Sequence, residues 1–371
     1  MDKKKILYIS TNSALGGISK YLLEIVQNLP NNIEPYFLMS SEGYFSDELQ
    51  KIGVPQDNIF FIKMTNSILD IGLHIQSNIK ALYLVNKIKP DIIHCNATTG
   101  AIVGAICGFL THTKTIYTVH GWPFTDGISK NKQNFYKVLE FIICSVFRKI
   151  ICVSEYDRQI GIKVLPMYKN KMVTIHNGIS DIPDEFKKKE FSKDKLKIVM
   201  ISRFCPQKDP YTLINAVSQL NKEGFNIELD LFGYGEELDR VLQTIEGTDC
   251  SNIQYKGEIS DVTPILKDYD VYALISNWEG LPIGIIEAMR AGLPILVSDV
   301  GGNSECIKEN GYLVNRQDVV DCKNKIKLFF VKEEELQFLS NNSRKYYEQE
   351  FMIEKKNETL LKEYARYESL K

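Results

Sequence analysis

The chain has 371 residues, of which 44% are hydrophobic and 25% are charged. These ordinary values exclude a disordered or fibrous chain, and the length suits two α/β domains of roughly 100–200 residues each. Forty-five basic and 47 acidic side chains give a formal net charge of −2, so no overall field attracts nucleic acid or an anionic membrane.

The apolar segments and the cysteines indicate the compartment. The apolar run that follows Lys3–Lys5 is too short for a signal peptide, and Ala101–Leu110 and Phe141–Phe147 are far shorter than the ~20 residues of a membrane-spanning helix. Eight cysteines occur without a Cys-x-x-Cys pair, as expected of reduced thiols. We therefore expect a cytoplasmic protein, with a peripheral position at the inner face of the cytoplasmic membrane left open.

Short β-branched runs alternate with longer amphipathic stretches in the first half, which predicts βαβ units and a parallel sheet. The first helix is expected from about Ser19 to Leu29. The expected strands are Lys5–Ser10, Glu34–Met39, Asp91–Cys95, Thr115–Val119, Lys149–Ser154 and Val173–Ile175. Their polar carboxyl ends are where a doubly wound sheet binds ligands.

A lysine-rich polar segment from Asn177 to Lys195 reads as a linker, after which the same rhythm restarts. Strands are expected at Lys197–Ser202, Glu228–Phe232, Ile253–Tyr255, Val271–Ile275 and Ile295–Ser298. Helices are expected near 210–223, 235–246, 282–291 and 318–331, and one or two more in the tail from Glu333 to Lys371. The sequence thus predicts two Rossmann-like domains with parallel sheets facing a central cleft, 1–178 and 179–371, with the last helix able to return to the first domain.

The densest motif runs from Ile275 to Pro294 and consists of a strand end, a Gly/Pro turn and a helix start. Backbone N–H groups at such a helix start, here at Leu281-Pro282-Ile283-Gly284, form an anion site, and glycine lets a diphosphate approach closely. Glu279 and Glu287 can line one edge of this pocket, where carboxylates bind sugar or ribose hydroxyls. A pair of solvated glutamates is the plain alternative.

This segment resembles the Glu-x7-Glu motif of retaining family 4 glycosyltransferases, which have the GT-B fold, and the match continues to Glu305. The resemblance implies that Glu287 binds the ribose of a nucleotide and that Glu279 lies near the donor sugar. It also implies a transfer that retains the configuration of the sugar.

A second motif, Arg203-Phe204-Cys205-Pro206-Gln207-Lys208, follows the first strand of the second domain. Two cations there can neutralise a leaving diphosphate. The motif resembles the family's Gly-Arg-x4-Lys-Gly, although Ser202 and Asp209 stand where glycine is common. Alone, an Arg and a Lys in a loop are usually surface charges.

In the first domain, Gly16 and Gly17 follow the first strand and precede a helix, and His120 ends another strand. Both features resemble family elements that contact the phosphate and sugar of the donor. A tight turn and a structural histidine are the alternatives. The loop lacks the glycine spacing of dinucleotide-binding folds and the Gly-Lys-Ser/Thr of a P-loop.

Further family-like turns contain Gly233 and Gly235, near the nucleotide, and Ile259, in a loop whose backbone meets the base. Asp268-Tyr269-Asp270 spells a metal-binding motif of another glycosyltransferase fold, but it precedes a strand and is expected to be structural. No His, Cys or Asp cluster has zinc spacing. The family resemblance implies that Arg203, Lys208 and backbone donors neutralise the diphosphate, so no metal or other cofactor is expected.

Together these features predict a glycosyltransferase that uses a nucleoside-diphosphate sugar, with a UDP-sugar favoured over a GDP-sugar. Arg203, Lys208, Glu279 and His120 are the expected catalytic residues. The resemblance to bacterial capsule, exopolysaccharide and O-antigen enzymes implies a lipid-linked saccharide as acceptor, and no nucleic acid as partner. A GT-B-fold sugar-nucleotide epimerase and a non-catalytic binding protein are the alternatives. Interleaved basic and aromatic residues such as Phe135-Tyr136-Lys137 can face a bilayer or simply a solvated surface.

Overall fold

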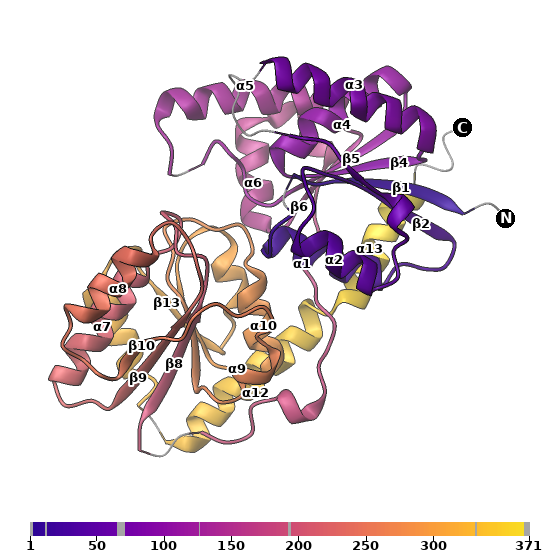
Figure 1. Cartoon of the computed structure of the whole chain (residues 1–371). Coiled ribbons are helices and arrows are strands. Elements are labelled where there is room, and N and C mark those ends of the chain that lie inside the picture. Colours follow the sequence, from indigo (N-terminus) through magenta and orange to yellow (C-terminus); the bar gives the residue numbers. More distant parts are fainter. Residues whose placement is uncertain are drawn as a thin grey trace. The chain divides into compact units, whose positions relative to one another are not determined.

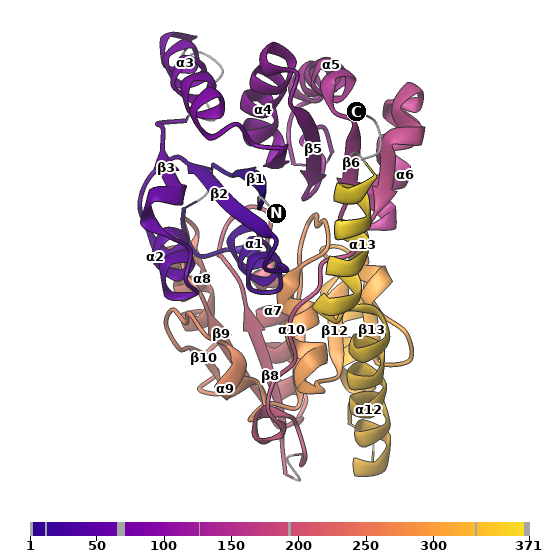
Figure 2. The ribbon, with the colours of Figure 1, turned by 90° about the vertical axis from the view of Figure 1, so that its right-hand side faces the viewer.

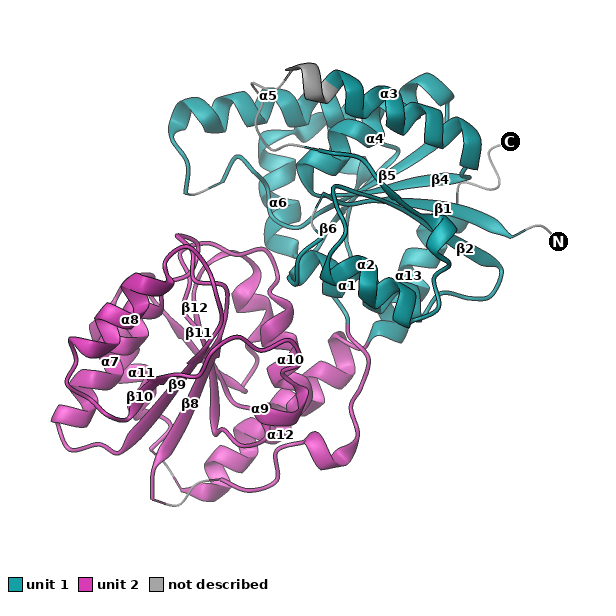
Figure 3. Cartoon of the chain, viewed as in Figure 1, with its two compact units in different colours: residues 1–178, 353–371 teal, residues 179–352 magenta. Residues whose placement is uncertain are grey.

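The computed structural model describes residues 3–11, 13–64, 71–125, 127–191, 194–330 and 332–366. The chain divides into two compact units, one formed by Met1–Gly178 together with Ile353–Lys371 and the other by Ile179–Met352 (Figures 1 and 3). The last helix, α13 (Ile353–Ala365), thus belongs to the first unit.

The described part of the first unit contains a seven-stranded parallel sheet in the order β3-β2-β1-β4-β5-β6-β7. The strands are β1 (Lys4–Ile9), β2 (Ile33–Met39), β3 (Ile59–Phe61), β4 (Ile92–Asn96), β5 (Lys114–Val119), β6 (Lys149–Cys152) and β7 (Met172–Thr174). The α-helices besides α13 are α1 (Gly17–Gln27), α2 (Tyr44–Lys51), α3 (Ile71–Ile88), α4 (Ala97–Thr111), α5 (Lys130–Val146) and α6 (Glu155–Val164).

The described part of the second unit contains a six-stranded parallel sheet in the order β10-β9-β8-β11-β12-β13. The strands are β8 (Leu196–Ile201), β9 (Ile227–Phe232), β10 (Ile253–Tyr255), β11 (Val271–Leu274), β12 (Ile295–Ser298) and β13 (Gly311–Val314). The α-helices are α7 (Pro210–Lys222), α8 (Leu238–Glu246), α9 (Thr263–Leu266), α10 (Ile283–Ala291), α11 (Val319–Lys327) and α12 (Glu333–Glu350). The two predicted parallel sheets are confirmed.

Local chemistry explains the burial of the central strands and the limits of two helices. Every residue of β11 and β12 is buried, as in parallel strands covered on both faces. The side chain of Asp209 accepts a hydrogen bond from the Thr212 N–H and caps α7, while Pro210 occupies the first helical position. Helix α10 ends at Gly292, whose φ of +82° suits a residue without a side chain.

Some predicted bounds were wrong for identifiable reasons. The predicted helix 235–246 begins only at Leu238, because Gly235 has a φ of +144° and belongs to a loop. The predicted helix 318–331 ends at Lys327. Strands β3 and β13 were missed, since both are short edge strands, and in β13 only Val314 is buried.

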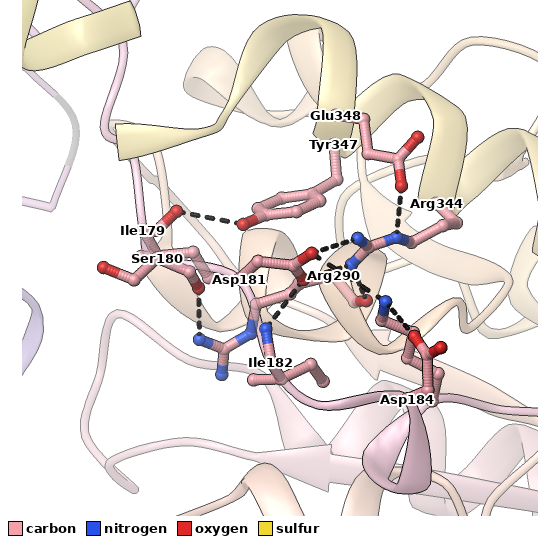
Figure 4. A network of polar contacts seen from close by, with 10 residues as sticks. Ile179, Ser180, Asp181, Ile182, Asp184, Arg290, Arg344, Tyr347 and Glu348 are labelled. Carbon is pink, nitrogen blue, oxygen red and sulfur yellow. Dashed lines mark hydrogen bonds and ion pairs between the residues drawn. The ribbon is translucent and has the colours of Figure 1, made fainter. Parts of the chain in front are cut away.

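The segment predicted to be a linker is held firmly to the second unit (Figure 4). Ile179 pairs with Met352, and its N–H donates to the Phe351 carbonyl at 3.0 Å. The guanidinium of Arg344 on α12 donates to both carboxylate oxygens of Asp181, at 2.6 Å and 2.5 Å, and to the Arg290 carbonyl at 2.9 Å. Burial opposes the shift, but the hydrogen bonds from Arg344 keep the pKa of Asp181 below its ordinary value.

In the same network, side chains from α10 and α12 donate hydrogen bonds to two backbone carbonyls of this segment (Figure 4). Arg290 donates to the Ser180 carbonyl at 2.9 Å, and the Tyr347 hydroxyl donates to the Ile179 carbonyl at 3.0 Å. Farther along, Lys188 is buried in an ion pair with Asp270 at 3.0 Å. The linker prediction was therefore wrong for residues 179–188, whereas the structural role predicted for Asp270 is confirmed.

Helix α13 packs into the first unit through polar contacts as well as apolar ones. The buried Tyr364 hydroxyl lies 2.6 Å from Nδ1 of His94 on β4 and 3.3 Å from the Tyr8 hydroxyl on β1. Asn357 donates to the Ile25 carbonyl of α1 at 3.2 Å. These contacts tie the end of the chain to the centre of the first sheet.

Glu140 is a fully buried acidic residue on α5. It accepts hydrogen bonds from Thr98 of α4 at 2.8 Å and from Tyr117 of β5 at 3.2 Å. Burial nevertheless raises its pKa to about 7, because these neutral donors only partly replace water.

Replacing Arg344 with leucine is expected to lower the free energy of unfolding by roughly 1–2 kcal/mol, because it breaks a two-pronged, charge-assisted contact. Arg158→Leu is the matched control and should cost less than about 1 kcal/mol, since Arg158 forms a partly exposed ion pair with Glu155 one turn away on α6. Denaturant unfolding of the two variants measures the difference. Equal losses would contradict the anchoring role of Arg344.

Glu140→Gln is expected to change how stability depends on pH. The carboxyl holds its proton more tightly in the folded chain than in the unfolded one, so its contribution is complete below about pH 4.5 and is lost as the pH rises through about 7. The wild type should therefore lose on the order of 3 kcal/mol relative to Glu140→Gln between pH 5 and pH 8. Parallel stability profiles of the two proteins over this range would contradict the shift.

Candidate active site

The carboxyl edge of the second sheet brings the predicted motifs of that unit together. Strand β8 lies between β9 and β11, and β12 follows β11. Because the strands are parallel, the loops that follow them meet at one edge of the sheet, where open α/β sheets bind ligands. These loops hold Arg203 and Lys208 after β8, Gly233 and Gly235 after β9, and Glu279 after β11.

Lys208 and Glu279 form a direct ion pair between the loops after β8 and β11. The side chains are only 13% and 5% exposed, so the pair is well shielded from water. Gln207 donates to the other carboxylate oxygen of Glu279 at 3.0 Å and to the Trp278 carbonyl at 2.9 Å. Lys208 and Ser276 also form an antiparallel bridge, which fixes the two loops relative to each other.

This pair and the role of Gln207 were not foreseen from the sequence, which treated the two charged residues as separate. An ion pair between loops 71 residues apart leaves no local signal in the chain. The pair holds Glu279 in one orientation, and it means that Lys208 is not an isolated positive charge.

Arg203 differs from Lys208 because its side chain is exposed. Its neighbours are anchored, since Ser202 N–H donates to the Phe232 carbonyl at 3.1 Å and Phe204 N–H donates to the Tyr234 carbonyl at 2.7 Å. None of the ion pairs found among the described residues involves Arg203. A fixed backbone thus presents a solvent-accessible guanidinium at the ligand edge.

Gly233 and Gly235 allow two loops to touch through their backbones. A Cβ atom would lie 1.8 Å from the Ser202 carbonyl oxygen at Gly233 and 2.1 Å from the Phe204 carbonyl oxygen at Gly235. Gly233 N–H also donates to the Gly257 carbonyl at 2.9 Å, so the loop that contains half-buried Ile259 lies beside the loop that contains Gly233. These glycines are therefore required for packing around Arg203, whatever they bind.

Helix α10 begins beside the Lys208–Glu279 pair. Its N-cap residue is Pro282 and no side chain caps it, whereas buried Leu281 and Ile283 anchor its start. A Cβ atom at Gly284 would lie 2.5 Å from the Tyr272 hydroxyl. Burial raises the pKa of Tyr272, and the charges of Glu287 and Glu279 raise it further, so both predicted carboxylates act on the same buried hydroxyl.

The loop after β12 completes this edge. Gly301 has a φ of +58°, and a Cβ atom there would lie 1.9 Å from the Glu279 carbonyl oxygen. Gly302 N–H donates to the Gly280 carbonyl at 2.8 Å. The Gly301-Gly302 pair supports the backbone of Glu279, a role that its place in the sequence motif did not reveal.

The first unit contains the other predicted residues, at the carboxyl edge of its own sheet. His120 follows β5, with Nε2 3.0 Å from Oδ1 of Asn96 and its ring edge-on to Tyr21 of α1 at 4.8 Å. Burial lowers its pKa to about 3, so the imidazole is neutral at neutral pH and can exchange hydrogen bonds without carrying charge.

The loop that contains Gly16 leads into α1, and Tyr21 of this helix contacts His120. Gly16 N–H donates to the Ser19 hydroxyl at 3.0 Å, and that hydroxyl donates to the Ala14 carbonyl at 3.0 Å. A Cβ atom at Gly17, the first residue of α1, would meet nothing within 4 Å, so packing does not explain this glycine. Asn12 of the same loop lies outside the described residues.

The predicted residues thus fall into two sets, one in each compact unit. Arg203, Lys208 and Glu279 lie in loops at the edge of the second sheet, and Glu287 lies on α10 of the same unit. Gly16, Gly17 and His120 follow strands β1 and β5 of the first unit. Within the described ranges, no group of three or more His, Cys, Asp and Glu side chains is placed to hold a metal ion.

Two Rossmann-like units with parallel sheets, each with predicted site residues beyond the carboxyl ends of its strands, are typical of the GT-B class of proteins. A search of solved structures agrees: Anabaena Alr3699/HepE in complex with UDP-glucose superposes with a TM-score of 0.83 at 19% identity, covering 98% of this chain and 99% of that one. A sucrose-phosphate synthase from Thermosynechococcus elongatus superposes with a TM-score of 0.79 at 16% identity over the full length of both chains.

Two family models and the sequence relatives agree with this class. "Glycosyl transferases group 1" matches residues 181–346, and "Glycosyltransferase Family 4" matches residues 15–181. The UDP-Gal:alpha-D-GlcNAc-diphosphoundecaprenol alpha-1,3-galactosyltransferase of Escherichia coli is 27% identical over 345 residues, 86% of each chain. The capsular polysaccharide biosynthesis glycosyltransferase CapH of Staphylococcus aureus is 26% identical, covering 81% of this chain and 83% of CapH. The two family models together span residues 15–346, and the chain belongs to the glycosyltransferases that have the GT-B fold.

Gly284→Ala is expected to destabilise the enzyme by roughly 1–3 kcal/mol, because the added methyl group overlaps the Tyr272 hydroxyl. The double variant with Tyr272→Phe should recover most of this loss, since the nearest ring carbon would be 3.5 Å away. Thermal unfolding of both variants and of Tyr272→Phe alone tests the contact. Gly17→Ala is the control and should leave stability unchanged, and a double variant no more stable than Gly284→Ala would refute the steric explanation.

Proposed function

We propose that the enzyme transfers a hexose, with retention of configuration, from a UDP-sugar to a hydroxyl group of a saccharide carried on a lipid diphosphate. One observation carries the proposal: cationic Arg203 and Lys208, carboxylates Glu279 and Glu287, and the start of α10 gather at one edge of the second sheet. This combination can bind both the anionic and the hydroxyl-bearing parts of a nucleotide sugar.

The main chemical task is to stabilise the leaving diphosphate. The bond between the anomeric carbon and the diphosphate breaks, a bond to the acceptor oxygen forms, and the acceptor proton passes to the leaving phosphate. Arg203 supplies an accessible positive charge, and the backbone N–H groups of the first turn of α10 supply further donors. Lys208 adds charge, partly balanced by Glu279, whose fixed carboxylate can accept hydrogen bonds from sugar hydroxyls.

The donor, acceptor and stereochemistry follow from likeness to relatives. The Anabaena structure contains UDP-glucose, and the Escherichia coli relative is named for UDP-Gal and for GlcNAc on diphosphoundecaprenol. Retention is supported by resemblance of the Glu279–Glu287 segment to the retaining family's motif. Contacts of Gly16, Gly17 and His120 with the donor stay predictions, as do those of Glu287 with its ribose and of Ile259 with its base.

The direct test incubates the purified enzyme with a panel of UDP- and GDP-sugars and a short-chain alkyl diphosphate bearing α-GlcNAc. A disaccharide product formed from a UDP-sugar, with the anomeric configuration of the donor by NMR, is the expected result. An inverted product would disprove retention. A sugar epimer formed from donor alone, with no disaccharide, would replace transfer by epimerisation.

Arg203→Ala is expected to lower kcat by roughly two to three orders of magnitude, because it removes charge stabilisation of the leaving group. Arg240→Ala is a matched control, since Arg240 is a solvent-exposed arginine on α8 of the same unit and should leave kcat within about twofold. Thermal unfolding of both variants verifies that they fold. A near-normal kcat for Arg203→Ala would remove Arg203 from the mechanism.

A further inference from the structure

Helices α3, α4 and α5 lie side by side over one face of the seven-stranded sheet, as the two views show (Figures 1 and 2). On α3, Ile75, Ile79 and Tyr83 are 56%, 64% and 67% exposed. Their spacing of four residues puts them on one side of the helix, so they form a single outward apolar stripe.

The other two helices continue this pattern. Phe109 and Leu110, near the end of α4, are 67% and 55% exposed, and Val138 and Ile142 on α5 are 62% and 59% exposed. Single exposed apolar residues need no explanation, but a stripe on α3 together with further large exposed apolar residues on the two neighbouring helices does. We call this surface the α3–α5 face.

The charges on these helices have one sign. They carry Lys80, Lys87, Lys130, Lys132 and Lys137. Their single carboxylate is Glu140, which is buried and bonded to Thr98 and Tyr117. No ion pair formed by described residues involves any of the five lysines. A chain with a net charge of −2 thus concentrates uncompensated positive charge beside exposed apolar side chains.

We propose that the α3–α5 face docks on an anionic lipid bilayer, with the apolar side chains entering the headgroup region and the lysines contacting lipid phosphates. This combination of an apolar stripe with flanking lysines is how interfacial helices bind membranes. Insertion is interfacial rather than spanning, because none of the helices described here is long and apolar enough to cross a membrane. A second copy fits poorly, since a symmetric contact would set these lysines against their equivalents.

The proposed function supplies only the reason for membrane docking, which is to bring the enzyme to an acceptor held in a membrane. The surface contains none of the predicted donor-site residues, because Arg203, Lys208, Glu279 and Glu287 belong to the second unit. Gly16, Gly17 and His120 belong to the first unit but lie outside α3, α4 and α5. Binding and catalysis can therefore be measured separately.

The test is co-sedimentation of the full chain with phosphatidylcholine vesicles that contain or lack phosphatidylglycerol, an anionic lipid. Binding to the anionic vesicles that weakens with added salt is expected. Lys80→Glu/Lys132→Glu should weaken it more than about tenfold, and Phe109→Gln/Ile142→Gln should also weaken it, since glutamine preserves helix propensity.

Matched controls use exposed residues of the second unit. Lys222→Glu/Lys345→Glu and Val320→Gln/Phe338→Gln should bind vesicles like the wild type. All variants should keep the thermal stabilisation by UDP of the wild type, which verifies folding.

Three outcomes would overturn the proposal: no binding to anionic vesicles, equal weakening by the control variants, or a dimer that the α3–α5 variants dissociate without any lipid binding. Vesicle binding by a chain that fails to transfer sugar would uphold the docking surface and refute only the proposed function. Sugar transfer to the short-chain acceptor without vesicle binding would do the reverse.

Discussion

The ion pair between Lys208 and Glu279 is the contact on which the candidate site depends. It joins the loops after two neighbouring strands, and a side chain from each is almost fully shielded from water. Removing one partner would leave a shielded charge unpaired, which is costly, so the two residues stabilise each other before any ligand arrives. The unbalanced positive charge at this edge therefore comes from Arg203 and from the first turn of α10.

Backbone contacts add rigidity to the same edge. At Gly233, Gly235 and Gly301 the space that a side chain would fill is taken by a neighbouring carbonyl group. The loops after β8, β9, β11 and β12 are thus packed against one another in series, with exposed Arg203 and half-buried Glu287 held between anchored residues. Such a preformed arrangement needs little reorganisation when charge develops on a bound group.

The alternation of buried strands and amphipathic helices was enough to predict both sheets, because parallel strands covered on both faces leave a continuous apolar signal. Motif spacing placed Arg203, Lys208 and Glu279 in loops after strands and Glu287 on the helix that follows. It could not reveal the Lys208–Glu279 pair or the role of Gln207, which depend on strand order. The polar segment after Asn177 looked like a linker because its partners, Arg290 and Arg344, lie more than 100 residues away.

The connectivity of the two units has a practical consequence. The second unit is an insertion in the first, entered at Ile179 and left at Met352, and the returning helix supplies Tyr364 to His94. A chimeric enzyme with exchanged donor specificity must therefore be joined at two points rather than one. A truncated protein that stops at residue 352 would also deprive the amino-terminal half of part of its own core.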